Sequence, residues 1–204
     1  MGTSCVLPQP RLESGVALEQ CLFARRSVRS YRPGPLTLAE AGQLLWAAQG
    51  ITAEGELRTA PSAGALYPLE TYLIAGKVKG IAPGVHHYRP GSHDLVLVKP
   101  GDLRQELAEA AIGQDCIREG AITILIAAVY ARTRGKYRER AARYVLLEAG
   151  HAAQNVCLQA TALGLSVVTV GAFHDHTVKN LAALPQNEDP IYLLPAGREE
   201  PARS

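Results

Sequence analysis

The sequence predicts an α+β fold in which helices flank one mixed sheet. Three observations predict it: a long helix pattern over 140–163, a uniformly apolar run over 121–129, and no regular alternation of strand and helix. The 204 residues are 47% hydrophobic and 20% charged. This composition is typical of a globular protein with a sizeable core and excludes an intrinsically disordered chain. We expect a single domain over 1–204, in which residues 1–14 are a flexible lead.

The N-terminal part contains two predicted helices. Residues 15–24 are expected to form a helix that leads into a cluster of arginines, and Pro-Gly dipeptides at 32–35 then break the chain. Thr37 and Glu40 have the T-x-x-E spacing of a capping box, with helical apolar spacing behind them. This pattern predicts a second helix, which Gly50 ends.

Five strands and three helices are expected in the remaining sequence. The strands are predicted at 70–75, 95–98, 121–129, 167–170 and 191–194. The Pro-Gly dipeptides at 83–84 and 90–91 are predicted to be turns between the first two strands. The helices are predicted at 102–112, 140–163 and 177–183. The run at 121–129 is apolar at every position, which is typical of a central strand covered on both faces. The helix at 140–163 carries a stripe of small apolar residues, which allows close packing.

Composition excludes several classes of protein. Lys and Arg number 21 against 19 Asp and Glu, so the charge is too balanced for a dedicated nucleic-acid binder. No apolar run approaches the roughly 20 residues that a membrane helix needs. The four cysteines are scattered and form no C-x-x-C pair, which favours reduced thiols. We expect a cytoplasmic protein that binds neither nucleic acid nor membrane.

The pattern Arg25-Arg26-Ser27-Val28-Arg29 is the strongest local feature. Three guanidinium groups and a hydroxyl within five positions can surround a phosphate, because arginine donates bidentate hydrogen bonds to it. The alternative is a solvated basic surface at the end of a helix. A second basic run lies at 132–143, and we interpret it as a solvated entry to the long helix.

Other motifs exclude some kinds of site and permit one. No G-x-G-x-x-G, Walker or G-x-S-x-G pattern is present. Glu148 and His151 form an E-x-x-H pair without the second pair that a di-metal site needs, so we expect no metal site. Small residues at 61–68 and 168–173 let a planar ligand approach the backbone, although each segment could also be an ordinary loop or turn.

Taken in this order, these segments resemble the nitroreductase-like family of FMN-dependent oxidoreductases, and most closely its SagB-type branch, which includes azoline dehydrogenases. The resemblance covers about 22–198. It rests on R-R-S-x-R at 25–29, P-S-A-G-A-L-Y-P at 61–68, G-Q at 113–114, K-Y at 136–137, L-L-E-A-G-H-x-x-Q-N at 146–155, and G-A-F at 171–173 running on to G-R at 197–198. It implies an α+β nitroreductase-like fold with a central mixed or antiparallel sheet, in an interlocked homodimer with two FMN sites at the subunit interface.

The resemblance also implies a role for individual residues. Those implied to hold the FMN phosphate are Arg25, Arg26, Ser27, Arg29 and, from the C-terminal end, Arg198. Those implied to surround the flavin ring are Pro61, Ser62, Ala63, Gly64 and Leu66, with the loop coming from the partner subunit, and Gln114, Val170, Gly171 and Ala172. Lys136 and Tyr137 match a pair that azoline-oxidising relatives use to remove a proton.

We therefore expect an FMN-dependent enzyme that transfers hydride between a nicotinamide or organic donor and a small organic acceptor. NAD(P)H and a small molecule are the expected substrates, and a second copy of the chain is the expected partner. Two alternatives remain open. One is azoline oxidation on a modified peptide, and the other is a flavin-binding module without turnover, because the same phosphate cluster would serve all three.

Overall fold

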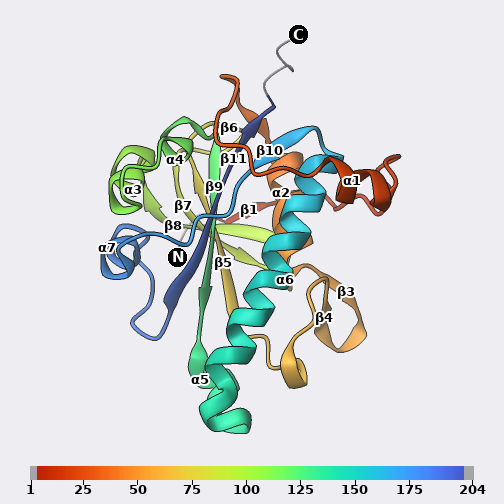
Figure 1. The fold of residues 1–204 in the computed structure, drawn as a ribbon, viewed down its shortest axis with the longest axis vertical. Coiled ribbons are helices and arrows are strands. Elements are labelled where there is room, and N and C mark those ends of the chain that lie inside the picture. Colours follow the sequence, from red (N-terminus) through yellow and green to blue (C-terminus); the bar gives the residue numbers. More distant parts are fainter. Residues whose placement is uncertain (1–3, 200–204) are drawn as a thin grey trace.

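The computed structural model describes residues 4–199, and its centre is a seven-stranded sheet with helices on both faces (Figure 1). Across the sheet, the strands are β1 (Ser4–Val6), β8 (Asp94–Pro100), β7 (Gly84–Arg89), β5 (Leu69–Ala75), β9 (Ile122–Ala128), β11 (Asp189–Arg198) and β10 (Leu165–Val167). Every neighbouring pair is antiparallel. The sheet is therefore antiparallel, which is one of the two arrangements that the resemblance implies, and the mixed sheet predicted from the pattern of elements is wrong.

Two groups of helices cover the two faces of this sheet (Figure 1). One face carries α1 (Leu18–Ala24), α2 (Leu38–Gln49) and α6 (Ala141–Ala162). The other carries α3 (Arg104–Ala110), α4 (Asp115–Glu119) and α7 (Asp175–Leu181). α5 (Tyr130–Tyr137) follows β9 and leads into α6 at the lower end of Figure 1. Two small ribbons complete the fold: β2 (Leu36–Thr37) with β6 (Val78–Lys79), and β3 (Ile51–Ala53) with β4 (Leu57–Arg58).

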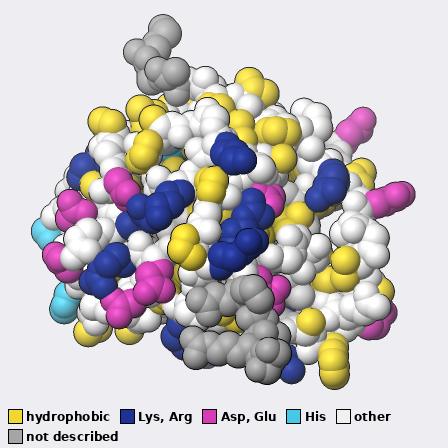
Figure 2. Space-filling model, turned by 90° about the horizontal axis from the view of Figure 1, so that it is seen from above, with side chains coloured by type: hydrophobic (Ala, Val, Ile, Leu, Met, Phe, Trp, Pro, Cys, Tyr) yellow, Lys and Arg dark blue, Asp and Glu magenta, His cyan; other side chains and the backbone are white. Residues whose placement is uncertain are grey.

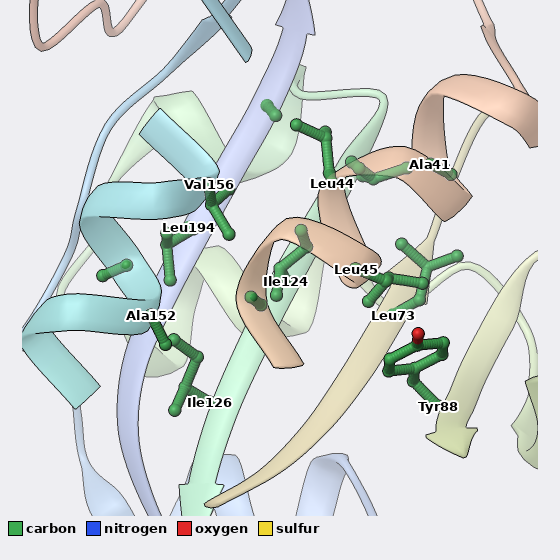
Figure 3. Close-up of a cluster of buried hydrophobic side chains, with 14 of the residues drawn as sticks. Ala41, Leu44, Leu45, Leu73, Tyr88, Ile124, Ile126, Ala152, Val156 and Leu194 are labelled. Carbon is green, nitrogen blue, oxygen red and sulfur yellow. The ribbon is translucent and has the colours of Figure 1, made fainter. Parts of the chain in front are cut away.

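The central strand β9 contributes to both layers of the core. All seven of its residues are buried, as the apolar run predicts. Its side chains alternate: Ile124 and Ile126 face α2 and α6, whereas Leu125 and Ala127 face the α3, α4 and α7 layer. Figure 3 shows Ile124 and Ile126 in the same cluster as Val156 of α6. A strand with helices on both faces must be apolar at every position, and this explains the pattern.

α2 begins with the capping box that the sequence predicts. The Thr37 hydroxyl accepts a hydrogen bond from the Glu40 N–H (3.2 Å), and the Glu40 carboxylate accepts one from the Thr37 N–H (2.7 Å). These bonds satisfy two N–H groups that the first turn of a helix leaves without partners. The helix carries the buried Leu44 and Leu45 into the core against β5.

Thr37→Ala is expected to lower the free energy of unfolding by about 1 kcal/mol, because the helix loses its capping hydroxyl. Chemical denaturation monitored by circular dichroism measures this change. Thr177→Ala is the matched control, since Thr177 is an exposed residue of α7 that does not cap the helix. Equal stability of the Thr37→Ala variant and the parent protein would contradict the proposed contribution of the cap.

Several elements differ from the sequence-based prediction. β7 lies between the two Pro-Gly dipeptides, where only turns are predicted, because its polar residues pair with strands on both sides. α4 and α5 are short helices, and their sequences show no helical repeat of apolar residues from which they could be predicted. The strand predicted at 167–170 is paired over 165–167, and Val170 makes only an isolated bridge to Leu193.

The N-terminal segment also differs from its prediction. Residues 4–6, predicted to lie within a flexible lead, pair with β8 as the edge strand β1. Leu7 follows them into the core and is 2% exposed. Its side chain packs next to Gly42 of α2. Across residues 4–199, no helix combines the length and the apolar character needed to cross a membrane.

Candidate functional site

The two ends of the chain meet along the edge strand β10. The Val28 N–H donates to the Val167 carbonyl (3.2 Å), and the Arg32 N–H donates to the Arg198 carbonyl (3.2 Å). Arg198 in turn pairs with Leu165 across β10 and β11. The arginine cluster at 25–29 is therefore held against the sheet by one backbone hydrogen bond within it, from Val28, and one just after it, from Arg32.

The side chains of this arginine cluster face several surroundings. Arg25 is half-buried beside α6. Burial raises the pKa of Cys157 in that helix, and the positive charge of Arg25 acts to lower it. Arg26 donates to the carbonyls of Phe23 and Arg25 (2.8 Å each). Ser27 and Arg29 are exposed. A cavity of about 240 Å³ lies beside the cluster, between Arg26 and β10.

The donor set of this cluster fits a phosphate group. Within residues 4–199, no Asp or Glu side chain pairs with Arg25, Arg26 or Arg29, so their positive charge is not neutralised inside the chain. Figure 2 views the end of the molecule at which β11 ends and shows Lys and Arg side chains among apolar and acidic ones. Exposed guanidinium groups on a fixed backbone are the groups that bind phosphate oxygens best.

Arg198 does not join this donor set in the structure. Its guanidinium pairs with the Glu40 carboxylate (2.5 and 2.8 Å) and donates to the Pro35 carbonyl (3.0 Å). Burial acts to raise the pKa of Glu40, but hydrogen bonds from Arg198 and Thr37 outweigh it and the pKa is lowered. Within the chain this side chain joins β11 to the start of α2, and its role at a phosphate stays a prediction.

Gln114 and Arg29 lie at the same end of α4. Gln114 precedes the helix, and its side-chain oxygen accepts a long hydrogen bond from the Cys116 thiol (3.9 Å). Burial raises the pKa of Cys116, and the nearby Arg29 charge opposes this. The Gln114 amide and the Arg29 guanidinium therefore both lie near Cys116.

The chain passes from the core to the surface at Val170, Gly171 and Ala172. Val170 is 3% exposed and bridges to Leu193, whereas Gly171 and Ala172 are exposed. A Cβ atom on Gly171 would lie 3.5 Å from the ring of Tyr192, an ordinary contact distance. Packing within the chain therefore does not require glycine here, and close approach of a planar ligand remains a reason for it.

The loop at 61–66 lies against Lys136 and Tyr137 of α5. Gly64 has φ +66°, and a Cβ atom there would lie 2.8 Å from the Lys136 Nζ and 2.9 Å from the Tyr137 hydroxyl. Lys136 Nζ also lies 5.6 Å from the centroid of the Tyr137 ring. The positive φ favours glycine at this position, and the structure brings together two motifs that are 72 residues apart in the chain, at 64 and 136.

The remaining residues of this loop are held by hydrogen bonds. The Ser62 hydroxyl accepts from the Tyr67 N–H (2.9 Å), which closes the turn that contains Ala63 and Gly64. Arg132 of α5 donates to the Tyr67 carbonyl (2.9 Å). Pro61 is exposed and Leu66 is half-buried. The loop is thus fixed to α5, the helix that carries Lys136 and Tyr137.

A buried carboxyl group beside this loop escaped the prediction. Glu148 is 2% exposed and borders a cavity of about 280 Å³ with Pro61, Ser62 and Ala63. Burial raises its pKa to about 7, although a hydrogen bond with Ser62 and the Arg58 charge act in the opposite direction. The signal in the sequence was the position of Glu148 three residues after the buried Val145, within the apolar stripe of α6.

The arginine cluster and this loop lie at different levels of α6. Arg25 is near Cys157, and Ser62 is near Glu148. Nine residues of helix separate these two positions, which corresponds to about 14 Å along the axis. The structure therefore brings the predicted site residues into two groups within one chain.

Comparison with protein families identifies one that matches most of the chain. The model described as "Nitroreductase family" matches residues 22–198. The protein MJ1384 of Methanocaldococcus jannaschii, which is named as a nitroreductase, is 44% identical over 199 residues, covering 98% of this chain and 99% of MJ1384. The microcin B17-processing protein McbC of Escherichia coli is 31% identical over 135 residues, covering 63% of this chain and 49% of McbC.

The solved structures lead to the same family. A crystal structure from Ralstonia eutropha JMP134, described as that of a nitroreductase, superposes with a TM-score of 0.85. The two chains are 28% identical, and the match covers 97% of this chain and 90% of the other. The similarity therefore includes the arginine cluster, the loop at 61–66 and α5.

Proposed function

Because this chain belongs to the nitroreductase family, we propose that it is an FMN-dependent oxidoreductase that transfers hydride between a nicotinamide or organic donor and a small organic acceptor. One observation carries the proposal. The guanidinium groups of Arg25 and Arg29 are held on a fixed backbone beside β10 and pair with no carboxylate within residues 4–199. A cation cluster of this kind fits a phosphate dianion.

The residues of the site have distinct roles in this proposal. Arg25, Arg26, Ser27 and Arg29 hold the FMN phosphate, which gives affinity but does not speed the reaction, since the phosphate is bound equally before and after it. When bound, FMN supplies the ring that accepts and returns hydride. The side-chain amide of Gln114 would hold the pyrimidine edge of the ring, and the exposed backbone of Gly171 and Ala172 would cover one face of it.

Lys136 and Tyr137 are the proposed proton-transferring pair. Both polar groups point to Gly64 in the loop that we place beside the ring. Proton transfer by a positioned side chain contributes about 10²- to 10⁴-fold to a rate. In this proposal, the pair would take the proton that the substrate loses on oxidation.

We propose that a second copy of the chain completes the site. The two groups of site residues lie about 14 Å apart along α6, so the loop of one copy can serve the FMN held by the other. Large apolar side chains are exposed on the surface that would be covered: Leu18, Leu22, Phe23, Leu146 and Leu147. Such patches commonly mark subunit interfaces.

The purified protein is expected to retain FMN, one per chain, and to retain riboflavin far more weakly because riboflavin lacks the phosphate. The bound FMN should lose its yellow colour under anaerobic NADH or NADPH and regain it with a nitroaromatic or a quinone. Absorbance at the flavin band measures the cofactor content and its reduction and reoxidation. Sedimentation of the yellow species measures whether the protein that carries FMN is a dimer. Failure to bind FMN, or equal binding of riboflavin, would overturn the proposal.

Dehydrogenation of an azoline in a modified peptide is a second candidate function. The Lys136–Tyr137 pair against Gly64 and the similarity to McbC favour it. Incubation with a thiazoline-containing peptide would then give the thiazole, with the loss of two hydrogen atoms in its mass. An unchanged peptide mass, together with reduction by NAD(P)H, would favour the small-molecule reaction.

A further inference from the structure

Glu148 is a buried acid whose side chain is only partly satisfied. It lies on the buried stripe of α6, and its Oε1 has no hydrogen-bond partner among residues 4–199. The group borders the cavity of about 280 Å³ beside the loop at 61–63. A buried carboxyl oxygen without a partner is costly to the fold, so its retention needs a reason beyond packing.

The polar and titratable groups near Glu148 come from the loop and from β4, α6 and α5. Ser62 of the loop lines the cavity with Glu148, and the charge of the Arg58 guanidinium of β4 acts to lower the pKa of Glu148. Tyr144 and His151 of α6 line the same cavity. Lys136 and Tyr137 of α5 lie against Gly64, two residues after Ser62.

A continuous set of contacts joins α5 to this cavity. The ring of Tyr137 packs edge-on against that of Tyr144, with 4.7 Å between centroids. Tyr144 stands one helical turn before Glu148 and lines the same cavity. The loop makes the second connection, because Gly64 lies against Lys136 while Ser62 lines the cavity with Glu148. Tyr144 and the loop therefore connect Lys136 and Tyr137 with the cavity that Glu148 borders.

We propose that Glu148 stores the proton that the Lys136–Tyr137 pair exchanges with the substrate. This proposal rests on the proposed function. The proton moves between the pair and the Glu148 carboxylate through the cavity that Ser62, Tyr144 and Glu148 line, and it returns by the same route. No electrons move in this step. Lys136 regains its earlier protonation state, and the carboxylate becomes a carboxylic acid.

The ionisation of Glu148 suits this role. Because burial raises its pKa to about 7, the acid and the carboxylate are both populated near neutral pH. A stored proton must be released as readily as it is accepted, and this holds when the pKa is close to the working pH. An exposed glutamate, with a pKa of about 4.3, would remain ionised instead.

Glu148→Gln tests the proposal, because glutamine copies the shape of the protonated acid but cannot ionise. We expect FMN binding and the fold to persist, turnover to fall about tenfold, and the ionisation near pH 7 to disappear from the pH–rate profile. Glu148→Asp, which can still ionise, should restore that ionisation. Glu188→Gln is the matched control: Glu188 is buried, its pKa is also raised by burial, and it hydrogen-bonds to Tyr72 away from the cavity.

A second measurement is independent of turnover. In the full-length protein with labelled glutamate, the ¹³C shift of one carboxyl group should titrate near pH 7 and vanish in Glu148→Gln. A Glu148→Gln variant with the parent pH–rate profile would overturn the role of Glu148, even if FMN binding and turnover are as proposed. Absence of FMN binding in the parent protein would instead overturn the proposed function, and the storage role with it.

Discussion

Replacement of both Arg25 and Arg29 by alanine is expected to weaken FMN binding by about 10²- to 10⁴-fold. Each charge-assisted hydrogen bond to phosphate contributes about 1.5–3 kcal/mol, so two lost guanidinium groups correspond to about 3–6 kcal/mol. Both side chains reach the solvent from a segment fixed to β10, so their removal leaves no buried group without a partner. Titration of the flavin-free protein with FMN, followed by fluorescence quenching, measures the change.

The control for this variant removes the same charge elsewhere. Lys77 and Lys79 are exposed residues beside the small ribbon β2–β6, and their double replacement by alanine should leave the FMN dissociation constant near that of the parent protein. Riboflavin binding gives a second check, because it should not respond to the loss of Arg25 and Arg29. If the arginine variant binds FMN as tightly as the parent protein, the phosphate lies elsewhere.

Lys136→Ala is expected to reduce turnover by about 10²- to 10⁴-fold while FMN remains bound. The side chain is exposed within a single chain and lies against Gly64, so its removal should cost little stability. The loss should therefore be in kcat, with the flavin content of the purified protein unchanged. Stopped-flow measurement of each half-reaction shows which of the two depends on the proton transfer.

Arg134→Ala is the matched control for Lys136→Ala. Arg134 is an exposed cation of the same helix, two residues earlier, and it does not contact Gly64. Its replacement should leave turnover unchanged. A Lys136→Ala enzyme with the turnover of the parent protein would deprive Lys136 of its proposed role, whereas a loss of FMN in that variant would show that the residue binds the cofactor.

The elements that the sequence predicted well have local causes. The capping box of α2 depends on Thr37 and Glu40, which are three residues apart, and the structure contains both of its hydrogen bonds. The apolar run of β9 predicted burial on both faces, and this is confirmed. In each case the pattern and the structure that it specifies lie in the same short segment, so no distant contact can change the outcome.

The errors arose where distant partners determine the structure. β7 is polar enough to resemble a turn region, and it is a strand because β5 and β8 pair with it on both sides. The ion pair of Arg198 also depends on a distant partner, because Glu40 is 158 residues away in the chain. Glu148 was interpreted as half of an incomplete metal motif, and the structure shows it as a buried acid beside the loop at 61–63.

By itself, the sequence determined the helices and strands with strong periodicity, the family to which the chain belongs, and the candidate phosphate ligands at 25–29, because each is a short pattern of residue types. Only the tertiary structure decided that the sheet is antiparallel, that Gly64 receives Lys136 and Tyr137, and that Glu148 faces a cavity. These outcomes depend on which distant segments become neighbours. That arrangement depends on the burial and strand pairing of the whole chain, which cannot be read from any single segment.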